Sequence, residues 1–355
     1  MQSTEQQVTV QTTLIFAVLN SLHQFLYVFL RYTQLSVGLC KEFVSMGFGS
    51  SKCLSTARLD GKVAIITGCN TGIGKVTAKD FFQRGARVIM ACRNLKAADE
   101  ALEEIKKQSE NCENCGEIRT TELDLSSLES VRKCARNILK DERQINLLIN
   151  NAGVMNCPYT KTKDGFELQF GTNHLGHFLF TLLLLPEIIR STPARIVNLS
   201  SVAHLGGTID FDDLNAERKI YWRVGAYSQS KLANVLFTKE LDRRLRKANI
   251  QGVNTYSVHP GLVKTELGRH MNAAIPGFST FTSLITKTPE QGAQTTIYCA
   301  VDEKCQNESG LYYAECKSKE PSRAALDEVT AKRLWEVSCK LVQLEEMYNP
   351  FEVPK

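Results

Sequence analysis

The length, composition and charge of the chain are those of an ordinary folded protein. It has 355 residues, of which 43% are hydrophobic and 23% charged, with 22 Gly and 9 Pro. This composition excludes long disorder, collagen and low-complexity structure. The net charge is only +5, and no segment carries a dense block of Lys and Arg. We therefore expect no nucleic-acid partner.

The cysteines indicate a reducing compartment. Twelve in a chain of this length are too dilute for a disulfide scaffold. Most lie in apolar runs or singly in loops, as expected of reduced thiols in a protein that faces the cytosol. Cys112 and Cys115 form a Cys-x-x-Cys pair, but no second ligand pair stands nearby to complete a zinc site. We interpret this stretch as a polar loop.

Residues 1–58 differ from the rest of the chain. No charged residue occurs from 14 to 30, which is close to the short limit for a membrane span. On a helix most polar side chains fall in one stripe: Thr13, Asn20, His23, Gln24, Arg31, Gln34, Lys41 and Glu42. The pattern predicts a membrane-associated helix that lies in the interface, or a span whose polar stripe faces a partner. An extra helix packed on the folded domain is the alternative.

The flanks of this apolar run predict its orientation. No Lys or Arg precedes the run and no small-residue cleavage site follows it, which disfavours a cleaved signal peptide. Arg31 and Lys41 follow the run and would hold the bulk of the chain in the cytosol. We expect attachment to the membrane of the endoplasmic reticulum or a similar organelle, with the folded domain facing the cytosol.

From residue 59 onward, short β-branched runs alternate with amphipathic helical patterns. Strands are predicted at 63–67, 87–91, 118–123, 147–150, 195–199, 252–258 and 310–314. Helices are predicted at 75–84, 97–108, 128–140, 166–185, 227–247, 289–301 and 325–344. This order predicts an α/β fold with a single Rossmann-type, doubly wound, seven-stranded parallel sheet and helices on both faces. Ligands of such sheets bind beyond the carboxyl ends of the strands.

Three parts of the chain follow from this pattern. We expect a membrane-associating segment and linker at 1–58 and a Rossmann domain with the binding and catalytic residues at 59–320. A closing helix and tail at 321–355 should have Trp335 and Leu341 packed inward.

A glycine-rich loop follows the first strand and leads directly into a helix. It reads TGCNTGIG at 67–74. Glycines let the backbone approach a pyrophosphate closely, and the helix N-terminus offers free N–H groups and a positive dipole end. We expect this loop to bind a dinucleotide through Gly68, Asn70, Thr71, Gly72, Ile73 and Gly74.

The ends of the second and fourth strands extend the dinucleotide site. Sheets that bind NAD place an acidic residue at the end of the second strand, but this chain has Cys92 followed by Arg93. A guanidinium there could hold a 2′-phosphate, so we predict NADP(H) as the cofactor; a solvated Arg at a strand end is the alternative. Asn151, Ala152 and Gly153 close the fourth strand with small residues that would let the cofactor lie against the backbone.

Tyr227 and Lys231 are four residues apart and would share one face of a helix. A phenol with a pKa of about 10 is a poor base at neutral pH. A neighbouring ammonium, together with the positive ring of an oxidised nicotinamide, would favour the phenolate and lower the pKa of Tyr227.

These motifs, in this order, resemble those of the short-chain dehydrogenase/reductase family over about residues 59–318. Finer features resemble its retinol dehydrogenase branch: TGCNTGIG, ACRN, NHLGHF, SKLAN and HPG. That branch implies an N-terminal membrane segment, NADP(H), and retinaldehyde or other apolar aldehydes as substrates.

The resemblance also implies roles for individual residues. Ser201, rather than Ser200, would hold the substrate carbonyl oxygen, and Asn173 would hold a water against Lys231 to complete a proton relay. Asp124 would contact adenine, although it could also cap the next helix. The segment after the sixth strand would pack on the nicotinamide through Pro260, Gly261, Val263 and Thr265.

The expected reaction is hydride transfer between NADPH and an apolar aldehyde, with Tyr227 as the acid/base. Lipid-derived aldehydes and steroid ketones remain alternative substrates, and a non-catalytic NADPH-binding sensor remains an alternative function. The oligomeric state stays open.

Two further patterns concern a histidine pair and an apolar segment. His174 and His177 are three apart and could suggest a metal, but no third ligand accompanies them, so we expect them to pack inside a helix layer. Residues 266–288 carry several apolar side chains among small ones, which predicts a lid over the cofactor or ordinary packing. These side chains are Met271, Ile275, Phe278, Phe281 and Leu284.

Overall fold

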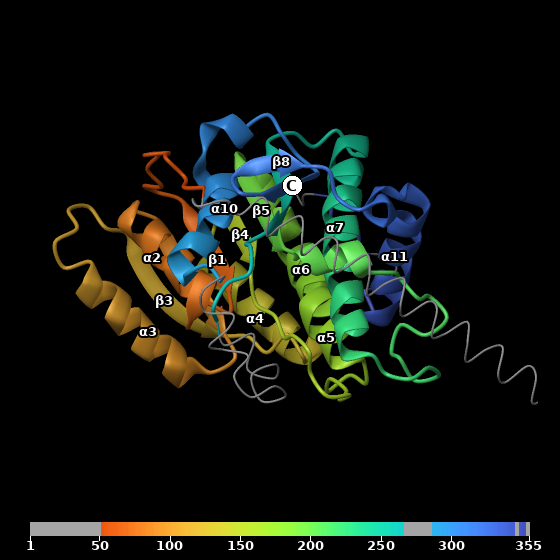
Figure 1. Cartoon of the computed structure of the whole chain (residues 1–355). Helices are drawn as coiled ribbons and strands as arrows, with labels where there is room; N and C mark the ends of the chain where they lie inside the picture. Colours follow the sequence, from red (N-terminus) through yellow and green to blue (C-terminus); the bar gives the residue numbers. More distant parts are fainter. Residues whose placement is uncertain (1–50, 266–285, 345–347, 353–355) are drawn as a thin grey trace, which may run out of the picture.

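An eight-stranded sheet forms the centre of the molecule (Figure 1). The structure is a computed structural model that describes residues 51–265, 286–344 and 348–352. Spatial strand order is β3-β2-β1-β4-β5-β6-β7-β8, so the order reverses between β1 and β4. The strands are β1 Val63–Thr67, β2 Arg87–Cys92, β3 Glu117–Glu122, β4 Leu147–Asn150, β5 Ala194–Leu199, β6 Val253–His259, β7 Leu311–Ala314 and β8 Lys317–Lys319.

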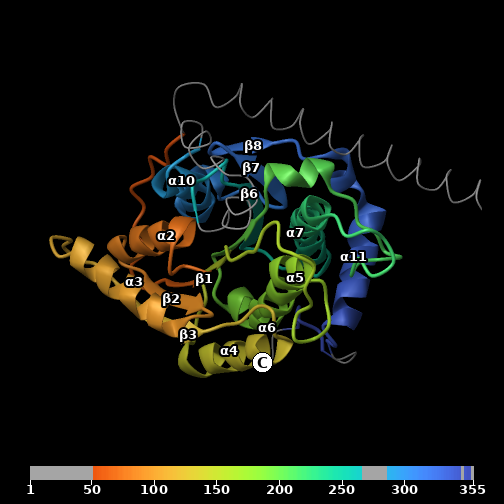
Figure 2. The same ribbon diagram turned by 60° about the horizontal axis from the view of Figure 1, so that its bottom comes forward.

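Helices cover both faces of the sheet (Figure 2). One face packs on α2 Gly72–Gln83, α3 Leu95–Gln108 and α10 Pro289–Val301. The other packs on α4 Leu128–Asp141, α6 Gly176–Arg190, α7 Arg223–Lys247 and α11 Glu328–Leu341. Because β1 lies between two helical layers, all five of its residues are buried, which explains its unbroken apolar sequence.

The predicted doubly wound architecture is confirmed, but the count of seven strands is wrong. An eighth strand, β8, pairs antiparallel with β7 at the edge of the sheet. The connecting residues Glu315 and Cys316 have φ of 54° and 52°, as a two-residue hairpin turn requires. The sequence pattern missed β8 because its three exposed residues, Lys-Ser-Lys, have no apolar face; charged edge strands of this kind resist pairing with other molecules.

The predicted helix at 166–185 is interrupted and longer than expected. It comprises a short turn, α5 Leu168–Phe170, then a π-helical turn, η1 Gly171–Leu175, and then α6, which continues to Arg190. Pro186 lies inside α6 and does not end it. Short turns also flank other elements, at η2 Val202–Gly206, η4 Glu303–Cys305 and η5 Arg323–Leu326.

The cysteine prediction needs one correction. The stretch around Cys112 and Cys115 is a loop, as predicted, but the two sulfurs form a disulfide. Their separation of three residues brings the two Cα atoms to 5.9 Å, within the range for a disulfide. The other cysteines in the described part of the chain are free, and most are buried.

The C-terminal helix closes one helical layer. Trp335 is buried, and its ring lies 5.1 Å from that of Phe178 on α6 and 5.8 Å from that of Phe237 on α7. Leu341 is partly buried against the same cluster. Both side chains therefore pack inward, as predicted. The N-terminal helix predicted within residues 1–58 lies mostly outside the described residues.

Candidate active site

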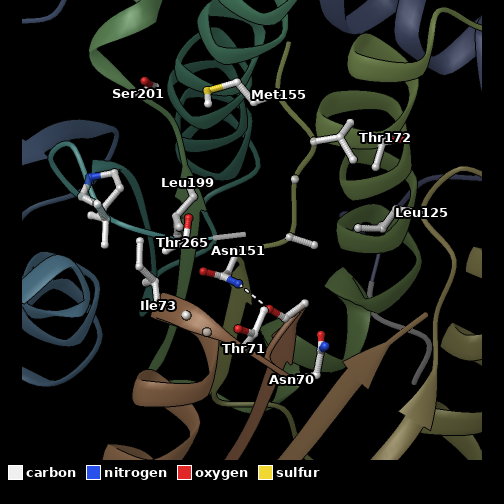
Figure 3. Close-up of a pocket in the computed structure, with 18 of the residues that line it drawn as sticks. Asn70, Thr71, Ile73, Leu125, Asn151, Met155, Thr172, Leu199, Ser201 and Thr265 are labelled. Carbon is white, nitrogen blue, oxygen red and sulfur yellow. Dashed lines mark hydrogen bonds between the residues drawn. The ribbon is translucent and has the colours of Figure 1, made fainter. Parts of the chain in front are cut away.

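A cavity of about 520 Å³ opens at the carboxyl edge of the sheet, where the strand order reverses (Figure 3). The segments that follow β1 to β6 line it, together with α7. Every residue that the sequence predicted for cofactor binding lines this cavity, as do Ser201, Tyr227 and Lys231. Asn173 does not line it and is fully buried behind its wall.

Two close approaches explain the glycines of the loop between β1 and α2. Gly68 has φ +63°, and a Cβ there would come within 2.7 Å of the Ala152 Cβ. A Cβ on Gly74 would lie 2.5 Å from the Asn151 amide nitrogen and 2.6 Å from the Gly68 carbonyl oxygen. Side chains at these two positions would therefore push the loop away from the residues that follow β4.

Asn151 and Thr67 fasten this loop to the end of β4. The Asn151 side-chain amide donates to the carbonyls of Thr67 (2.8 Å) and Gly68 (3.0 Å). The Thr67 hydroxyl accepts the backbone N–H groups of Asn151 (3.0 Å) and Ala152 (2.9 Å). These four bonds hold the glycine-rich loop and the β4 end as one unit.

The second and third strands end at the far side of the cavity. Arg93 lines the cavity, its side chain is exposed, and no ion pair forms between it and any acidic side chain in the described ranges. The side chain of the neighbouring Asn94 is not available to a ligand in the same way, because it caps α3 by accepting from Ala97 N. Arg93 is thus available to an anionic group.

Asp124 is already partly engaged. Burial opposes its ionisation, but hydrogen bonds from Ser126 and the charges of Lys163 and Arg93 lower the pKa of Asp124 overall. Ser127, not Asp124, caps α4. The alternative role of Asp124 as a helix cap is therefore wrong, while a role toward adenine stays a prediction.

Tyr227 and Ser201 meet at one end of the cavity. Tyr227 is buried on α7, and the Ser201 hydroxyl lies beside its phenol. Burial raises the pKa of Tyr227 to about 12, and the neighbouring Ser201 hydroxyl only partly opposes this. In the protein alone, loss of water around the phenolate outweighs its neighbours, and the lowered pKa expected beside an oxidised nicotinamide stays a prediction.

Lys231 lies one turn further along α7, with Nζ 5.6 Å from the centre of the Tyr227 ring. Its ammonium donates to the Leu199 carbonyl (3.1 Å), and burial lowers the pKa of Lys231 to about 8. A lysine with this pKa is mostly protonated at pH 7 but can give up its proton, as a proton relay requires.

The two serines after β5 have different partners. The Ser200 hydroxyl donates to the Lys231 carbonyl (2.8 Å), so it anchors the strand end to α7. The Ser201 hydroxyl accepts from Ala203 N (3.2 Å) and also reaches Tyr227. Of the two, Ser201 is the hydroxyl that lies beside the phenol.

The Asn173 side chain is fully engaged within the protein. It accepts from Val154 N (2.8 Å), and its amide donates to the Val154 carbonyl and the Ser230 hydroxyl, both at 2.9 Å. Asn173 lies in the π-helical turn η1, and such turns are frequent at functional sites. Both hydrogens of the Asn173 amide are therefore committed, and a role of Asn173 in holding a water against Lys231 stays a prediction.

The cavity also has lining residues that sequence patterns did not single out. They are Ala91, Asn94, Leu123, Leu125, Val154, Met155, Thr172, Leu199, Ser200 and Leu262. In Figure 3, Met155 and Ser201 lie at the end of the cavity opposite Asn70 and Thr71. The Thr172 hydroxyl is buried without a hydrogen-bond partner in the described structure. Most of these lining residues lie at the ends of predicted strands or soon after them, and this position was the one signal available.

The segment after β6 closes the cavity from the other side. Gly261 has φ +91°, and a Cβ there would lie 2.8 Å from the Lys287 side chain. Lys287 is buried and paired with Glu315, so it fixes this segment against the β7–β8 turn. Most of the lid predicted at 266–288, residues 266–285, lies outside the described residues.

The two neighbouring histidines pack inside the helical layer, as expected. Burial lowers the pKa of His174 to about 3 and that of His177 to about 4, so both are neutral. Across the described ranges, no group of three or more His, Cys, Asp or Glu is arranged to hold a metal. Among the helices that the structure describes, none is both long and apolar enough to cross a membrane.

Comparison with known proteins places the chain in a family. The family model described as short chain dehydrogenase matches residues 62–276. The chain belongs to the short-chain dehydrogenase family, whose members are oxidoreductases that use NAD(P).

Particular relatives are similar over most of their length. Retinol dehydrogenase 13 of Mus musculus is 47% identical over 311 residues, which cover 86% of this chain and 90% of that protein. Retinol dehydrogenase 12 of Homo sapiens is 48% identical over 295 residues, covering 83% of this chain and 90% of that protein. The chain is therefore retinol dehydrogenase-like, as its motifs predicted.

Solved structures share the fold. An uncharacterized protein from Mycobacterium paratuberculosis is 35% identical, with a TM-score of 0.67 over 84% of this chain and 99% of that chain. An NAD(P)-dependent gluconate 5-dehydrogenase from Beutenbergia cavernae, with bound NADP, has a TM-score of 0.57. It is 23% identical and covers 73% of this chain and 96% of that chain, so it supports the fold alone.

Proposed function

We propose that this protein is an NADP(H)-dependent oxidoreductase that interconverts an apolar aldehyde and its alcohol, with retinaldehyde and retinol as the first candidates. The observation that carries the proposal is the convergence of Ser201, Tyr227 and Lys231 in one cavity with the glycine-rich loop. Ser201, Tyr227 and Lys231 without the loop could belong to a structural surface. The glycine-rich loop without these three side chains could belong to a nucleotide-binding module.

The residues present fit a dinucleotide. The glycine-rich loop, which glycines at 68 and 74 allow to lie against the residues after β4, forms a cradle that leads to the N-terminus of α2, and the exposed Arg93 lines the same cavity. Gly68, Gly72 and Gly74 would let the pyrophosphate approach, and Arg93 would hold the 2′-phosphate that distinguishes NADPH from NADH.

When bound, NADPH supplies the hydride that reduces the aldehyde carbon. Ser201 would donate a hydrogen bond to the substrate oxygen and orient it toward Tyr227. Because the pKa of Tyr227 is raised to about 12, the phenol keeps its proton at neutral pH and can donate it to the oxygen as negative charge develops. The raised pKa thus suits the reductive direction, and the reverse reaction needs a group that stabilises the phenolate.

Lys231 would then resupply the proton to Tyr227. Its pKa of about 8 leaves it protonated at pH 7 yet able to release a proton. A water held by Asn173 would connect this ammonium to solvent. In this mechanism the protein provides orientation and proton transfer.

The substrate assignment is supported by the similar retinol dehydrogenases and by the cavity wall. Met155 and Leu199 present apolar surface in the same cavity as Ser201. Lipid-derived aldehydes and steroid ketones would suit the same surface and are the competing substrates.

We also propose that residues 1–58 attach the protein to a membrane, with the catalytic domain facing the cytosol. The apolar run at 14–30 and the basic residues that follow it support this. Retinoids partition into bilayers, so attachment would place the enzyme beside its substrate. Flotation of the full chain with liposomes, compared with a chain beginning at residue 51, tests this directly.

The central experiment measures NADPH oxidation by detergent-solubilised protein with all-trans-retinaldehyde, a C9 aldehyde and a steroid ketone. Tyr227→Phe is the control, since it removes only the hydroxyl. We expect retinaldehyde to be turned over fastest, and the variant to lose most turnover while it still binds NADPH. Turnover of only the other carbonyls would discard the retinoid assignment and keep the mechanism. Equal turnover by Tyr227→Phe would overturn the mechanism.

A further inference from the structure

His177 lies at the start of α6, and both of its ring nitrogens have partners inside the protein. Only 2% of the residue is exposed. Nδ1 lies 3.0 Å from the main-chain carbonyl oxygen of Asn173, and Nε2 lies 2.8 Å from the Thr67 hydroxyl. The imidazole therefore joins the end of β1, beside the glycine-rich loop, to the π-helical turn.

The partners determine which nitrogen carries the proton. A carbonyl oxygen can only accept, so Nδ1 carries the hydrogen and donates it to Asn173. Nε2 of the neutral ring then accepts from the Thr67 hydroxyl. That hydroxyl also accepts the N–H groups of Asn151 and Ala152, so its single proton is free to point at His177. The other acceptor near this hydroxyl, the Ile149 carbonyl, is much further away at 3.5 Å.

We propose that His177 is a positioning residue that couples the cofactor cradle to the proton relay. Through Thr67 it fixes the backbone of the β4 end that faces the cofactor. Through the Asn173 carbonyl it fixes the backbone of the π-helical turn that carries Asn173, the residue expected to hold a water against Lys231. The second half of this statement rests on the proposed function, whereas the first half depends only on the cradle.

His177→Asn and His177→Gln separate the two contacts. The amide nitrogen of Asn takes the place of Nδ1, so His177→Asn keeps the donor to Asn173 and loses the contact with Thr67. The longer Gln reaches the position of Nε2, so His177→Gln keeps Thr67 and loses Asn173. His174→Gln is the matched control, because His174 is equally buried nearby but contacts Ser338 of α11 through Nε2 (2.9 Å).

We expect His177→Asn to weaken NADPH binding by about two- to tenfold, the effect of one hydrogen bond, with kcat at saturating NADPH little changed. We expect His177→Gln to bind NADPH almost normally, with kcat lowered about tenfold or more and its pH profile displaced. His174→Gln should alter stability and neither of these quantities. Identical losses in both His177 variants, or a control that behaves like them, would overturn the proposal.

Nuclear magnetic resonance of ¹⁵N-histidine in the full chain gives a readout without substrate. The chain has six histidines, so few signals arise, and the one lost in His177→Asn is assigned. We expect a neutral Nδ1–H ring that does not titrate above pH 5. A proton on Nε2, or titration near pH 6.5, would overturn the proposal. If retinaldehyde is not turned over but the ring state and the NADPH effect hold, the substrate assignment fails and the coupling to the cradle stands.

Discussion

Arg93 is the single side chain on which the choice between NADPH and NADH should depend. Arg93→Asp replaces a cation near the expected 2′-phosphate with an anion, as sheets that bind NAD have there. We expect the preference for NADPH over NADH to fall at least about tenfold, since one charge-assisted hydrogen bond contributes roughly 1.5 to 3 kcal/mol. Fluorescence titration with both cofactors measures this.

Lys96→Asp is the control for net charge, because Lys96 is exposed on the next helix and does not line the cavity. It should leave the cofactor preference unchanged. An unaltered preference in Arg93→Asp would mean that another group reads the phosphate.

We expect the buried charge of Lys231 to destabilise the folded protein. Burial lowers the pKa of Lys231 from 10.5 to about 8. Below pH 8 the ammonium is therefore charged in both states, but it is desolvated in the folded protein and hydrated in the unfolded chain. This penalty is fully present at pH 7 and disappears as the pH rises from about 8 to 10.5. We expect Lys231→Met to raise the free energy of unfolding by roughly 2 to 3 kcal/mol at pH 7 and by less than half of that at about pH 9.5.

Urea unfolding at the two pH values tests this, with Lys239→Met on the same helix as the control. Lys231→Met leaves no buried carbonyl without a donor, because the Leu199 carbonyl also accepts from the Asn234 amide at 3.0 Å. A gain that did not shrink with pH would point to packing instead of charge.

At the scale of elements, α11 is held mainly by Trp335. Its ring packs against Phe178 and Phe237, and the Arg244 guanidinium lies 4.5 Å from it on another side. We expect Trp335→Ala to lower the free energy of unfolding by about 3 to 5 kcal/mol, as for other large aromatic residues in cores. Val329→Ala, at a position 75% exposed on the same helix, should cost less than about 0.5 kcal/mol. Urea unfolding followed by circular dichroism compares the two, and similar losses would contradict the assignment.

The sequence predicted elements well where local patterns determine them. The 289–301 helix has a capping box formed by Thr288 and Gln291 with Pro289 at its start, and its predicted bounds match the structure. The π-helical turn η1 and strand β8 could not be predicted in this way. The π-helical turn carries Asn173, whose side chain contacts Val154 and Ser230 far along the chain, and β8 depends on pairing with β7, so neither has a periodicity of its own.

The site likewise has features that the sequence predicts and features that depend on contacts made only in the folded protein. Gly68, Tyr227 and Lys231 could be located because strand order brings their segments to one edge. The raised pKa of Tyr227 could not be predicted, since it depends on how completely the folded protein excludes water from the phenol. The contacts of His177 could not be predicted from the sequence either, because its partners Asn173 and Thr67 lie four and 110 residues away.

For the whole molecule, buried neutral histidines should make the fold sensitive to acid. Burial lowers the pKa values of His174, His177 and His204 to about 3, 4 and 4, against about 6.5 when unfolded. Below pH 6.5 the unfolded chain therefore binds protons that the folded protein does not. The stability is complete above pH 6.5 and is lost as the pH falls toward 4.

Three such groups give a slope of up to about 4 kcal/mol per pH unit, since each proton contributes about 1.4. Urea unfolding between pH 7.5 and 5, above the range in which carboxylates titrate, measures it. His174→Gln should reduce the slope by about one third. A stability that stayed constant from pH 7.5 to 5 would contradict the neutral state of these rings.

The strand order has a consequence during synthesis. β1, β2 and β3 are consecutive in the chain, but the other edge of β1 pairs with β4. From the end of β1 at Thr67 to the start of β4 at Leu147 the ribosome must add 80 residues (147 − 67). At roughly 5 to 20 residues per second, that edge remains unpaired for about 4 to 16 s. During this interval the nascent chain exposes an apolar strand that other chains could pair with, so slow translation before residue 147 would favour aggregation.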